Sequence, residues 1–274
     1  MMAPQMQVAA IQMVSGVSLP ANLEAARALL EQAARGGAEL AVLPEYFCLM
    51  GRKDSDKLAL REAFGDGAVQ RFLASAAREL GLWIVGGTLP LVAGDEDHVR
   101  NTNLVFSPSG ECVARYDKIH LFTFDNGRER YDESRVIESG REPVAFELTA
   151  RDGQRWRIGL SVCYDLRFPE LYRALTADVL LVPSAFTHVT GQAHWELLLR
   201  ARAIENLAYV IAPAQGGLHE NGRRTWGHSM IVDPWGVVLA QREAEGAGVV
   251  GGALDPARLA QVRRQLPALE HRVL

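Results

Sequence analysis

One cysteine of the chain stands where an apolar segment gives way to polar residues. Cys163 lies in GLSVCYDLRFPE, residues 159–170, after the apolar residues 158–162 and shortly before FPE, a typical helix start. The pattern predicts a buried strand, a tight turn that carries Cys163, and then a helix. Such a turn exposes the side chain and offers the next backbone N–H, that of Tyr164, to an oxyanion. A buried free cysteine is more often a small hydrophobic side chain, so a nucleophile needs further residues beside it.

A glutamate at the end of another apolar run is a candidate base. Glu45 ends LAVLPE, and Tyr46 and Phe47 follow it. A carboxylate among aromatic side chains is poorly solvated, which suits it to accept and return protons near neutral pH. The alternative is a glutamate that caps a helix or closes a salt bridge at a strand end. Taken alone, Glu45 favours that alternative.

A lysine in ARYDKIHLF is a candidate for charge stabilisation. Lys118 would usually lie at a solvated strand edge or extend its ammonium to water. Here the neighbouring apolar residues allow an inward ammonium, which would need a carboxylate partner. A nearby ammonium lowers the pKa of a thiol from its usual value of about 8.5. Glu45, Lys118 and Cys163 together are the parts of an acyl-transfer site.

The elements that must position these residues alternate along the chain. We expect buried strands in six runs rich in Val, Ile and Leu: VAAIQMV, LAVLPE, LWIVGGT, RIGLSVC, VLLVPSAF and YVIAPAQ. Helical spacing covers residues 20–35, 67–80, 169–176, 193–206 and 256–266. The alternation predicts an α/β fold.

The order of these elements occurs about twice. VLPEYF at 42–47 resembles LVPSAF at 181–186, and NLVFSPSGECVARY at 103–116 resembles SMIVDPWGVVLAQR at 229–242. Each longer segment predicts two strands joined by a turn with proline and glycine. Unless the halves look alike by chance, two apolar sheet faces must be buried, which favours a four-layer α-β-β-α sandwich. Because no linker rich in Pro, Gly or Ser divides the chain, we expect one domain over residues 1–274.

Composition excludes several classes of protein. The 274 residues carry a net charge of −4, which gives no basic surface for nucleic acid or an anionic membrane. No run approaches the ~18 apolar residues of a membrane span, and the first residues lack the pattern of a secretory signal. Cys48, Cys112 and Cys163 form no C-x-x-C motif. We therefore expect a cytoplasmic protein without disulfides or a structural zinc site.

Three stretches, in this order, resemble the catalytic motifs of the nitrilase, or carbon-nitrogen hydrolase, superfamily: LPEYF, RYDKIHLF and GLSVCYDLRFPEL. The resemblance continues through VPSAF, HWELLLRARAIEN, WGHSMIVDPWG and RRQLPALEHR, and it covers nearly the whole chain. The chain is most similar to the branch of amidases that act on deaminated glutathione and on ω-amides of keto acids. The fold of that family is also an α-β-β-α sandwich.

The resemblance implies hydrolysis of the C–N bond of a small carboxylate-bearing amide through a thioester on Cys163, with no cofactor and no metal. Glu45 would act as general base, then protonate the departing ammonia or amine, then activate water. Lys118 and the Tyr164 N–H would hold the oxyanion. A second family glutamate corresponds to Glu133 in YDES, where it would position Lys118 or the water. The resemblance also implies a homodimer or an assembly of dimers.

Candidates for substrate binding follow the nucleophile. Arg167 is suited to a substrate carboxylate because its planar guanidinium can form two parallel hydrogen bonds. A salt bridge to Asp165 or Glu170 is an equal alternative for Arg167. Phe186 and Thr187, at the end of the second repeat's VPSAF segment, are further candidates. Two later cations, residues 223 and 224, precede TWGHS on a loop that could also reach the substrate.

Two departures from close relatives leave the exact amide open. TFDNG stands in HLFTFDNGRERYDES where relatives resemble F-D-V-D, and Gln192 stands where proline is common. A nitrilase or carbamoyl hydrolase of the same superfamily is the alternative function. Outside the class, Cys163 could be a redox-sensing thiol in a protein without catalysis, which leaves the coincidence of Glu45 and Lys118 unexplained.

Overall fold

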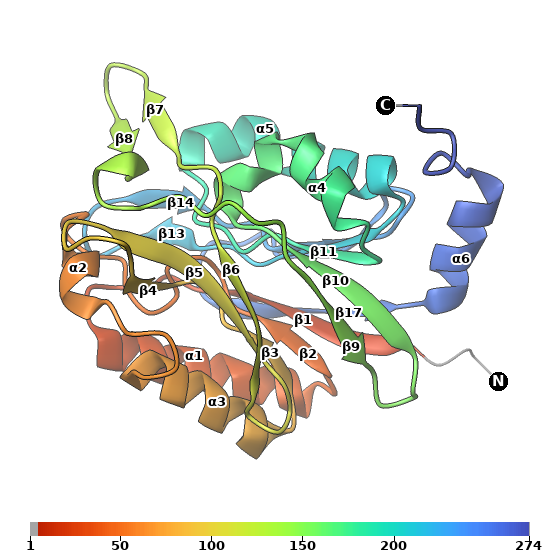
Figure 1. Cartoon of the computed structure of the whole chain (residues 1–274), viewed down its shortest axis with the longest axis horizontal. Coiled ribbons are helices and arrows are strands. Elements are labelled where there is room, and N and C mark those ends of the chain that lie inside the picture. The colour runs from red at the N-terminus through yellow and green to blue at the C-terminus, as the bar shows by residue number, and fades with distance from the viewer. Residues whose placement is uncertain (1–4, 274) are drawn as a thin grey trace.

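Two β-sheets packed face to face form the centre of the computed structural model, which describes residues 5–273 (Figure 1). The first sheet has seven strands in the order β17-β1-β2-β3-β5-β4, with β6 paired to β5. Its strands are β1 (Met6–Gln12), β2 (Leu40–Val42), β3 (Trp83–Val85), β4 (Leu89–Val92), β5 (Val99–Phe106), β6 (Cys112–Asp117) and β17 (Gly248–Leu254).

The second sheet has six strands in the order β16-β15-β12-β11-β10-β9. Its strands are β9 (Ala145–Thr149), β10 (Arg155–Leu160), β11 (Val179–Leu181), β12 (Tyr209–Ala212), β15 (Met230–Val232) and β16 (Val238–Gln241). Two short hairpins lie outside both sheets: β7 (Thr123–Asp125) with β8 (Arg130–Asp132), and β13 (Gly216–Leu218) with β14 (Arg224–Trp226).

Helices cover the outer face of each sheet (Figure 1). The helices α1 (Leu19–Arg35) and α3 (Ala68–Leu80) pack on the first sheet, and α4 (Pro169–Leu175) and α5 (His188–Asn206) pack on the second. The other helical segments are α2 (Asp56–Leu60), α6 (Pro256–Gln265) and the 3₁₀ helices η1 (Glu133–Arg135) and η2 (Cys163–Arg167). No helix within residues 5–273 has the length and apolar character needed to cross a membrane. The predicted four-layer α-β-β-α sandwich is confirmed.

The predicted repeat is visible in the strand pairing. In the first sheet β1, β2 and β3 pair in parallel, and β5 and β6 then continue antiparallel. In the second sheet β10, β11 and β12 pair in parallel, and β15 and β16 continue antiparallel. The two halves therefore share one succession of strand directions.

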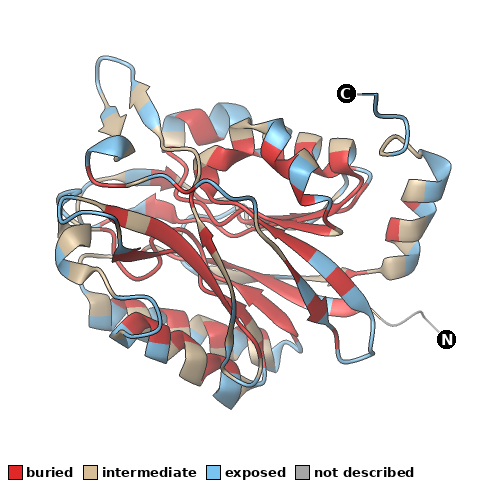
Figure 2. Cartoon of the chain, viewed as in Figure 1, coloured by how far each residue is buried: buried red, intermediate tan, exposed pale blue. Residues whose placement is uncertain are grey.

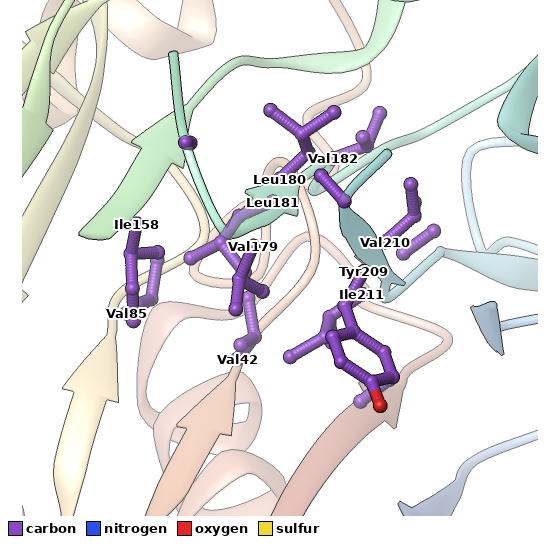
Figure 3. Close-up of a cluster of buried hydrophobic side chains, with 14 of the residues drawn as sticks. Val42, Val85, Ile158, Val179, Leu180, Leu181, Val182, Tyr209, Val210 and Ile211 are labelled. Atoms are coloured by element: carbon purple, nitrogen blue, oxygen red, sulfur yellow. The ribbon is translucent and has the colours of Figure 1, made fainter. Parts of the chain in front are cut away.

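The main core lies between the sheets. Figure 3 shows Val42 and Val85 of the first sheet facing Ile158 and Val179 of the second. Helices bury the other faces, so the central strands are buried on both sides, whereas exposed residues follow the outer helix surfaces (Figure 2). Burial on both faces explains why these strands have continuous apolar runs without alternation.

Three predicted boundaries are corrected by the structure. The strand expected over 157–163 ends at Leu160, because the Asp165 carboxylate accepts the Val162 N–H at 2.8 Å and turns the chain into η2. Likewise β2 ends at Val42, so Glu45 follows the strand instead of ending it. The helix expected over 193–206 begins earlier, at His188. Its first turn was not predicted because weak helix formers such as Gly191 interrupt the helical pattern of the sequence there.

Candidate active site

The three residues predicted to do chemistry meet at one cavity. Glu45 follows β2, Lys118 follows β6, and Cys163 begins η2 after β10. Glu45, Cys163 and Glu133 line the cavity. The Lys118 ammonium lies behind the two carboxylates and donates a hydrogen bond to each of them. Residues from both sheets therefore form a single site.

Lys118 points inward and is fully buried. Its Nζ donates to Glu45 Oε1 at 2.9 Å and to Glu133 Oε2 and Oε1 at 2.7 and 3.0 Å. Burial by itself lowers the pKa of Lys118, but the charges of Glu133 and Glu45 outweigh that effect and hold the pKa above its ordinary value. Lys118 is thus a permanent ammonium, with two carboxylate partners where the sequence required one.

Glu45 is held by three hydrogen-bond donors. Oε1 accepts from Lys118 and from Asn101 Nδ2, both at 2.9 Å, and Oε2 accepts from the Ala185 N–H at 3.0 Å. The residue is 1% exposed. A set made only of donors suits an ionised carboxylate, the form that a general base needs. Asn101 and Ala185 were not predicted, because Asn101 is one of four successive polar residues in β5 (VRNTNLVF) and Ala185 acts through its backbone.

The backbone of Cys163 adopts a left-handed conformation, with φ of +50°, which is uncommon for a residue with a side chain. Its N–H donates to the Pro183 carbonyl at 3.0 Å. No acceptor within residues 5–273 takes the N–H of Tyr164, so this group is free to donate into the site. The geometry resembles the sharp strand-to-helix turn expected from the sequence.

Asp165 anchors this turn. The fully buried carboxylate accepts from the Val162 N–H, from Tyr116 OH at 2.6 Å, and from the backbone and ring nitrogens of His120 at 3.1 and 2.7 Å. His120 in turn stacks on Phe168, with ring centroids 3.7 Å apart. This role was not predicted, because Tyr116 and His120 lie 49 and 45 residues from Asp165 along the chain.

The Cys163 thiol is neutral at rest. Burial raises its pKa well above the ordinary value, and the charge of Glu45 raises it further. Lys118 acts in the expected direction and lowers this pKa, but its charge is shared with two carboxylates. The net shift is therefore opposite to the one expected from a neighbouring lysine, and the thiol needs a base at the moment of attack.

Glu133 supports Lys118 from the other side. Besides Lys118, its carboxylate accepts from Tyr46 OH at 2.7 Å and from the Phe122 N–H at 2.8 Å. Burial alone raises the pKa of Glu133, but Lys118 outweighs burial and holds the pKa below its usual value. The structure therefore brings Glu133 into the position that the resemblance implied.

The remaining predicted residues line the same cavity. Its lining consists of Glu45, Phe122, Glu133, Cys163, Tyr164, Arg167, Ala185, Phe186, Thr187, Thr190 and Arg223. The Arg167 guanidinium lies over the Tyr164 and Phe186 rings, at 5.8 and 5.4 Å from their centroids. Within residues 5–273 no carboxylate lies within 4.0 Å of Arg167, so the alternative of a salt bridge is not present. Arg224 is exposed and pairs with Glu245 at 2.6 Å, away from the cavity.

The cavity thus combines a thiol and a carboxylate base, with a buried cation hydrogen-bonded to that base, and it is also lined by Tyr164, whose N–H has no acceptor among residues 5–273. Across residues 5–273, His, Cys, Asp and Glu side chains nowhere gather in a group of three or more that could hold a metal ion. The arrangement suits nucleophilic acyl transfer, in which the base moves the thiol proton and the cation meets the developing oxyanion.

Comparison with known proteins identifies the class. The family model for carbon-nitrogen hydrolases matches residues 7–264, and the chain belongs to this family of enzymes. It is 44% identical to the deaminated glutathione amidase of Synechocystis sp. (strain PCC 6803 / GT-S), over 97% of each chain.

Solved structures agree with this placement. The C. elegans NitFhit protein superposes with a TM-score of 0.87 at 37% identity, covering 100% of this chain, which spans 66% of that longer polypeptide. A mutant amidase from Nesterenkonia sp. AN1, in which acrylamide has added to the active-site cysteine, has a TM-score of 0.78 at 26% identity. That comparison covers 96% of this chain and 98% of the amidase.

Proposed function

We propose that this enzyme hydrolyses small carboxylate-bearing amides, such as deaminated glutathione or the ω-amide of a keto acid, through a thioester on Cys163. The observation that carries the proposal is the buried set of Glu45, Lys118 and Cys163 around one cavity. The similarity to deaminated glutathione amidases supports the substrate class. Three unpaired cysteines agree with a cytoplasmic location, which is part of the same proposal.

In the first half-reaction the Cys163 Sγ bonds to the amide carbon while its proton passes to Glu45. The carbonyl π electrons move to oxygen, and this oxyanion accepts from the Tyr164 N–H and Lys118 Nζ. One Lys118 N–H becomes available to the oxyanion when Lys118 gives up one of its two hydrogen bonds to Glu133. As the oxyanion collapses, the C–N bond breaks and Glu45 returns the proton to the leaving nitrogen.

In the second half-reaction Glu45 removes a proton from water, and the hydroxyl oxygen attacks the thioester carbon. The same donors hold the second oxyanion. Its collapse breaks the C–S bond, the thiolate takes the proton from Glu45, and the carboxylic acid product leaves. Glu133 touches Lys118 and not the reacting atoms, so we assign it a positioning role.

The proposed substrate class predicts that substitution of Arg167 weakens substrate binding. Arg167→Lys should mainly raise KM for an ω-amide of 2-oxoglutarate, because a point charge replaces a guanidinium that binds a carboxylate at two points. An uncharged amide of equal length should have a kcat/KM lower by about 10-fold or more, the usual effect of losing a charged hydrogen bond. Coupled ammonia assays measure both quantities.

Arg155→Lys is a matched control, since Arg155 is an exposed β10 residue outside the cavity. Equal kcat/KM for the charged and uncharged amides would contradict the assignment and indicate a general aliphatic amidase. A nitrile analogue in the same assay tests the alternative of a nitrilase, which would turn it over at least as fast as the amide.

An exposed apolar surface supports the proposal of a homodimer. Val189, Leu197 and Ile204 of α5 are 51, 70 and 46% exposed, and Trp235 in the β15–β16 hairpin is 50% exposed. The helix and the hairpin adjoin, since Arg200 Nε donates to the Gly236 carbonyl at 2.9 Å. Several exposed large apolar side chains on one helix and its adjoining hairpin are typical of an interface.

Light scattering at micromolar concentration should therefore give twice the 30.0 kDa chain mass, or an even multiple of it for an assembly of dimers. Leu197→Glu should shift the protein toward monomer, because an interfacial charge without a partner opposes association. Glu196→Gln, on the neighbouring exposed position of α5, is the control that keeps the dimer. A monomer mass for the unmodified protein would contradict the proposal.

A further inference from the structure

At rest the Lys118 ammonium has no hydrogen left for an oxyanion. An ammonium has three N–H donors. Three carboxylate oxygens accept from Lys118 Nζ, namely Glu45 Oε1 at 2.9 Å, Glu133 Oε2 at 2.7 Å and Glu133 Oε1 at 3.0 Å. The Lys118 side chain is fully buried, so bulk water does not reach the ammonium. The proposed contact between Lys118 and the oxyanion therefore requires that one of these three hydrogen bonds break.

The bond from Lys118 to Glu133 Oε1 is the easiest of the three to give up. It is the longest, and Oε1 also accepts from the Tyr46 hydroxyl at 2.7 Å. The bond to Oε2 is shorter, although the Phe122 N–H donates to that oxygen at 2.8 Å. When Lys118 leaves Oε1, Tyr46 still donates to Oε1 and the Phe122 N–H still donates to Oε2. No buried carboxylate oxygen of Glu133 then loses its last donor, which is the costly outcome.

Tyr46 is held so that its hydroxyl meets Glu133. Its backbone is left-handed, with φ of +57°, and its N–H donates to Thr88 Oγ1 at 2.9 Å. This conformation is uncommon for a residue with a large side chain and is typical of functional sites. Burial raises the pKa of Tyr46 well above its ordinary value, and the charges of Glu133 and Glu45 raise it further. The hydroxyl therefore stays protonated at neutral pH and donates to the carboxylate.

We propose that Tyr46 is a positioning residue for the oxyanion step, a deduction that rests on the proposed function. Its hydroxyl keeps Glu133 Oε1 hydrogen-bonded and in place while Lys118 turns the N–H that Oε1 had accepted toward the oxyanion. As the oxyanion collapses, this N–H returns to Oε1, and the same exchange takes place in the second half-reaction. Tyr46 is not part of the cavity lining, so it acts through Glu133 and Lys118.

Tyr46→Phe removes only the hydroxyl. Lys118 must then either leave Glu133 Oε1 without a donor or break its shorter bond to Oε2. For the ω-amide of 2-oxoglutarate, kcat should fall about 10-fold or more while KM stays within about twofold. Tyr209→Phe is the matched control, because its hydroxyl donates to the Asp255 carbonyl at 3.1 Å outside the cavity, and it should keep both wild-type constants. A coupled ammonia assay measures kcat and KM.

A thioamide analogue of the same substrate separates the oxyanion step from a general loss of geometry. Its thiocarbonyl sulfur is a weak hydrogen-bond acceptor, so a hydrogen bond from Lys118 contributes less to its hydrolysis. Tyr46→Phe should therefore slow hydrolysis of the thioamide much less than hydrolysis of the amide. Equal slowing of both would mean that Tyr46 only maintains the shape of the site, and the proposal would be overturned. An unchanged kcat for the amide would overturn it as well.

An aldehyde analogue, in which CHO replaces the carboxamide, provides a test that needs no variant. Cys163 Sγ bonds to the aldehyde carbon, the thiol proton passes to Glu45, and the carbonyl oxygen becomes the oxyanion. In a crystal structure of this adduct, Lys118 Nζ should lie within hydrogen-bond distance of that oxygen and more than ~3.5 Å from Glu133 Oε1, which Tyr46 still contacts. The proposal is wrong if Lys118 keeps all three carboxylate contacts or if Tyr46 leaves Oε1. If the wild-type protein releases no ammonia and forms no adduct, the proposed function itself has failed.

Discussion

Cys163→Ala should abolish amide hydrolysis while leaving the protein folded. The variant loses the atom that forms the thioester, and loss of a catalytic nucleophile typically lowers kcat by about 10⁴-fold or more. The fold should tolerate the change because the thiol makes no contact that anchors the turn, which Asp165 and the Cys163 N–H hold instead. The free energy of unfolding should change by less than about 1.5 kcal/mol. Coupled ammonia release and urea unfolding measure the two effects.

Cys112→Ala is the matched control, since Cys112 lies on β6 outside the cavity and should keep wild-type turnover. Mass spectrometry of the wild-type protein quenched during turnover should show the acyl group on the peptide that contains Cys163. Ammonia release by Cys163→Ala at more than about one-tenth of the wild-type rate would remove this residue from the mechanism.

Local pattern predicted the centre of the fold well and its periphery poorly. The six apolar runs correspond to central strands, which the facing sheet buries on one side and helices bury on the other, and the five helical segments correspond to α1, α3, α4, α5 and α6. The strand β17 was missed because GVVGGAL is rich in glycine, and its pairing of Leu254 with Met6 joins distant parts of the chain. The short polar hairpin β7–β8 has no buried face to create a pattern. The expectation of one domain over residues 1–274 stays a prediction.

The candidate site was predictable where a residue interrupts an apolar run. Glu45, Lys118 and Cys163 each stand at such an interruption, and the structure brings all three together. Glu133 emerged only from the resemblance, because YDES is an ordinary polar loop sequence. Arg223 and Arg224 were both candidate cations, and only the structure shows that Arg223 lines the cavity and Arg224 does not. Burial and unpaired donors are properties of the folded chain that no local pattern records.

The buried charges show how the site activates a neutral thiol. Lys118 with Glu45 and Glu133 leaves one net negative charge in the interior. That charge opposes ionisation of Cys163, so the thiol resists premature deprotonation and alkylation at rest. When the proton moves to Glu45, the net charge on the carboxylates falls as the thiolate forms. Transfer of the proton from Cys163 to Glu45 and attack by the Cys163 sulfur are thereby coupled.

Glu45→Gln should abolish hydrolysis and at the same time lower the pKa of Cys163. Loss of the general base should reduce kcat by about 10²–10⁴-fold. A glutamine cannot accept from all three donors, because its NH₂ must face either the Ala185 N–H or the pair Lys118 and Asn101. Stability should therefore fall by about 1–3 kcal/mol, the usual cost of an unsatisfied buried donor.

The thiol pKa follows from the same substitution. In the wild-type protein the raised pKa means that thiolate absorbance at 240 nm should still be rising above pH 9. Glu45→Gln removes a negative charge that disfavours the thiolate and leaves Lys118, which favours it, so the thiolate should appear at lower pH. A Cys163→Ala background, titrated in parallel, gives the absorbance of all other groups. An unchanged or higher thiol pKa in Glu45→Gln would show that Glu45 does not face Cys163 as a charge, and would remove it as the base.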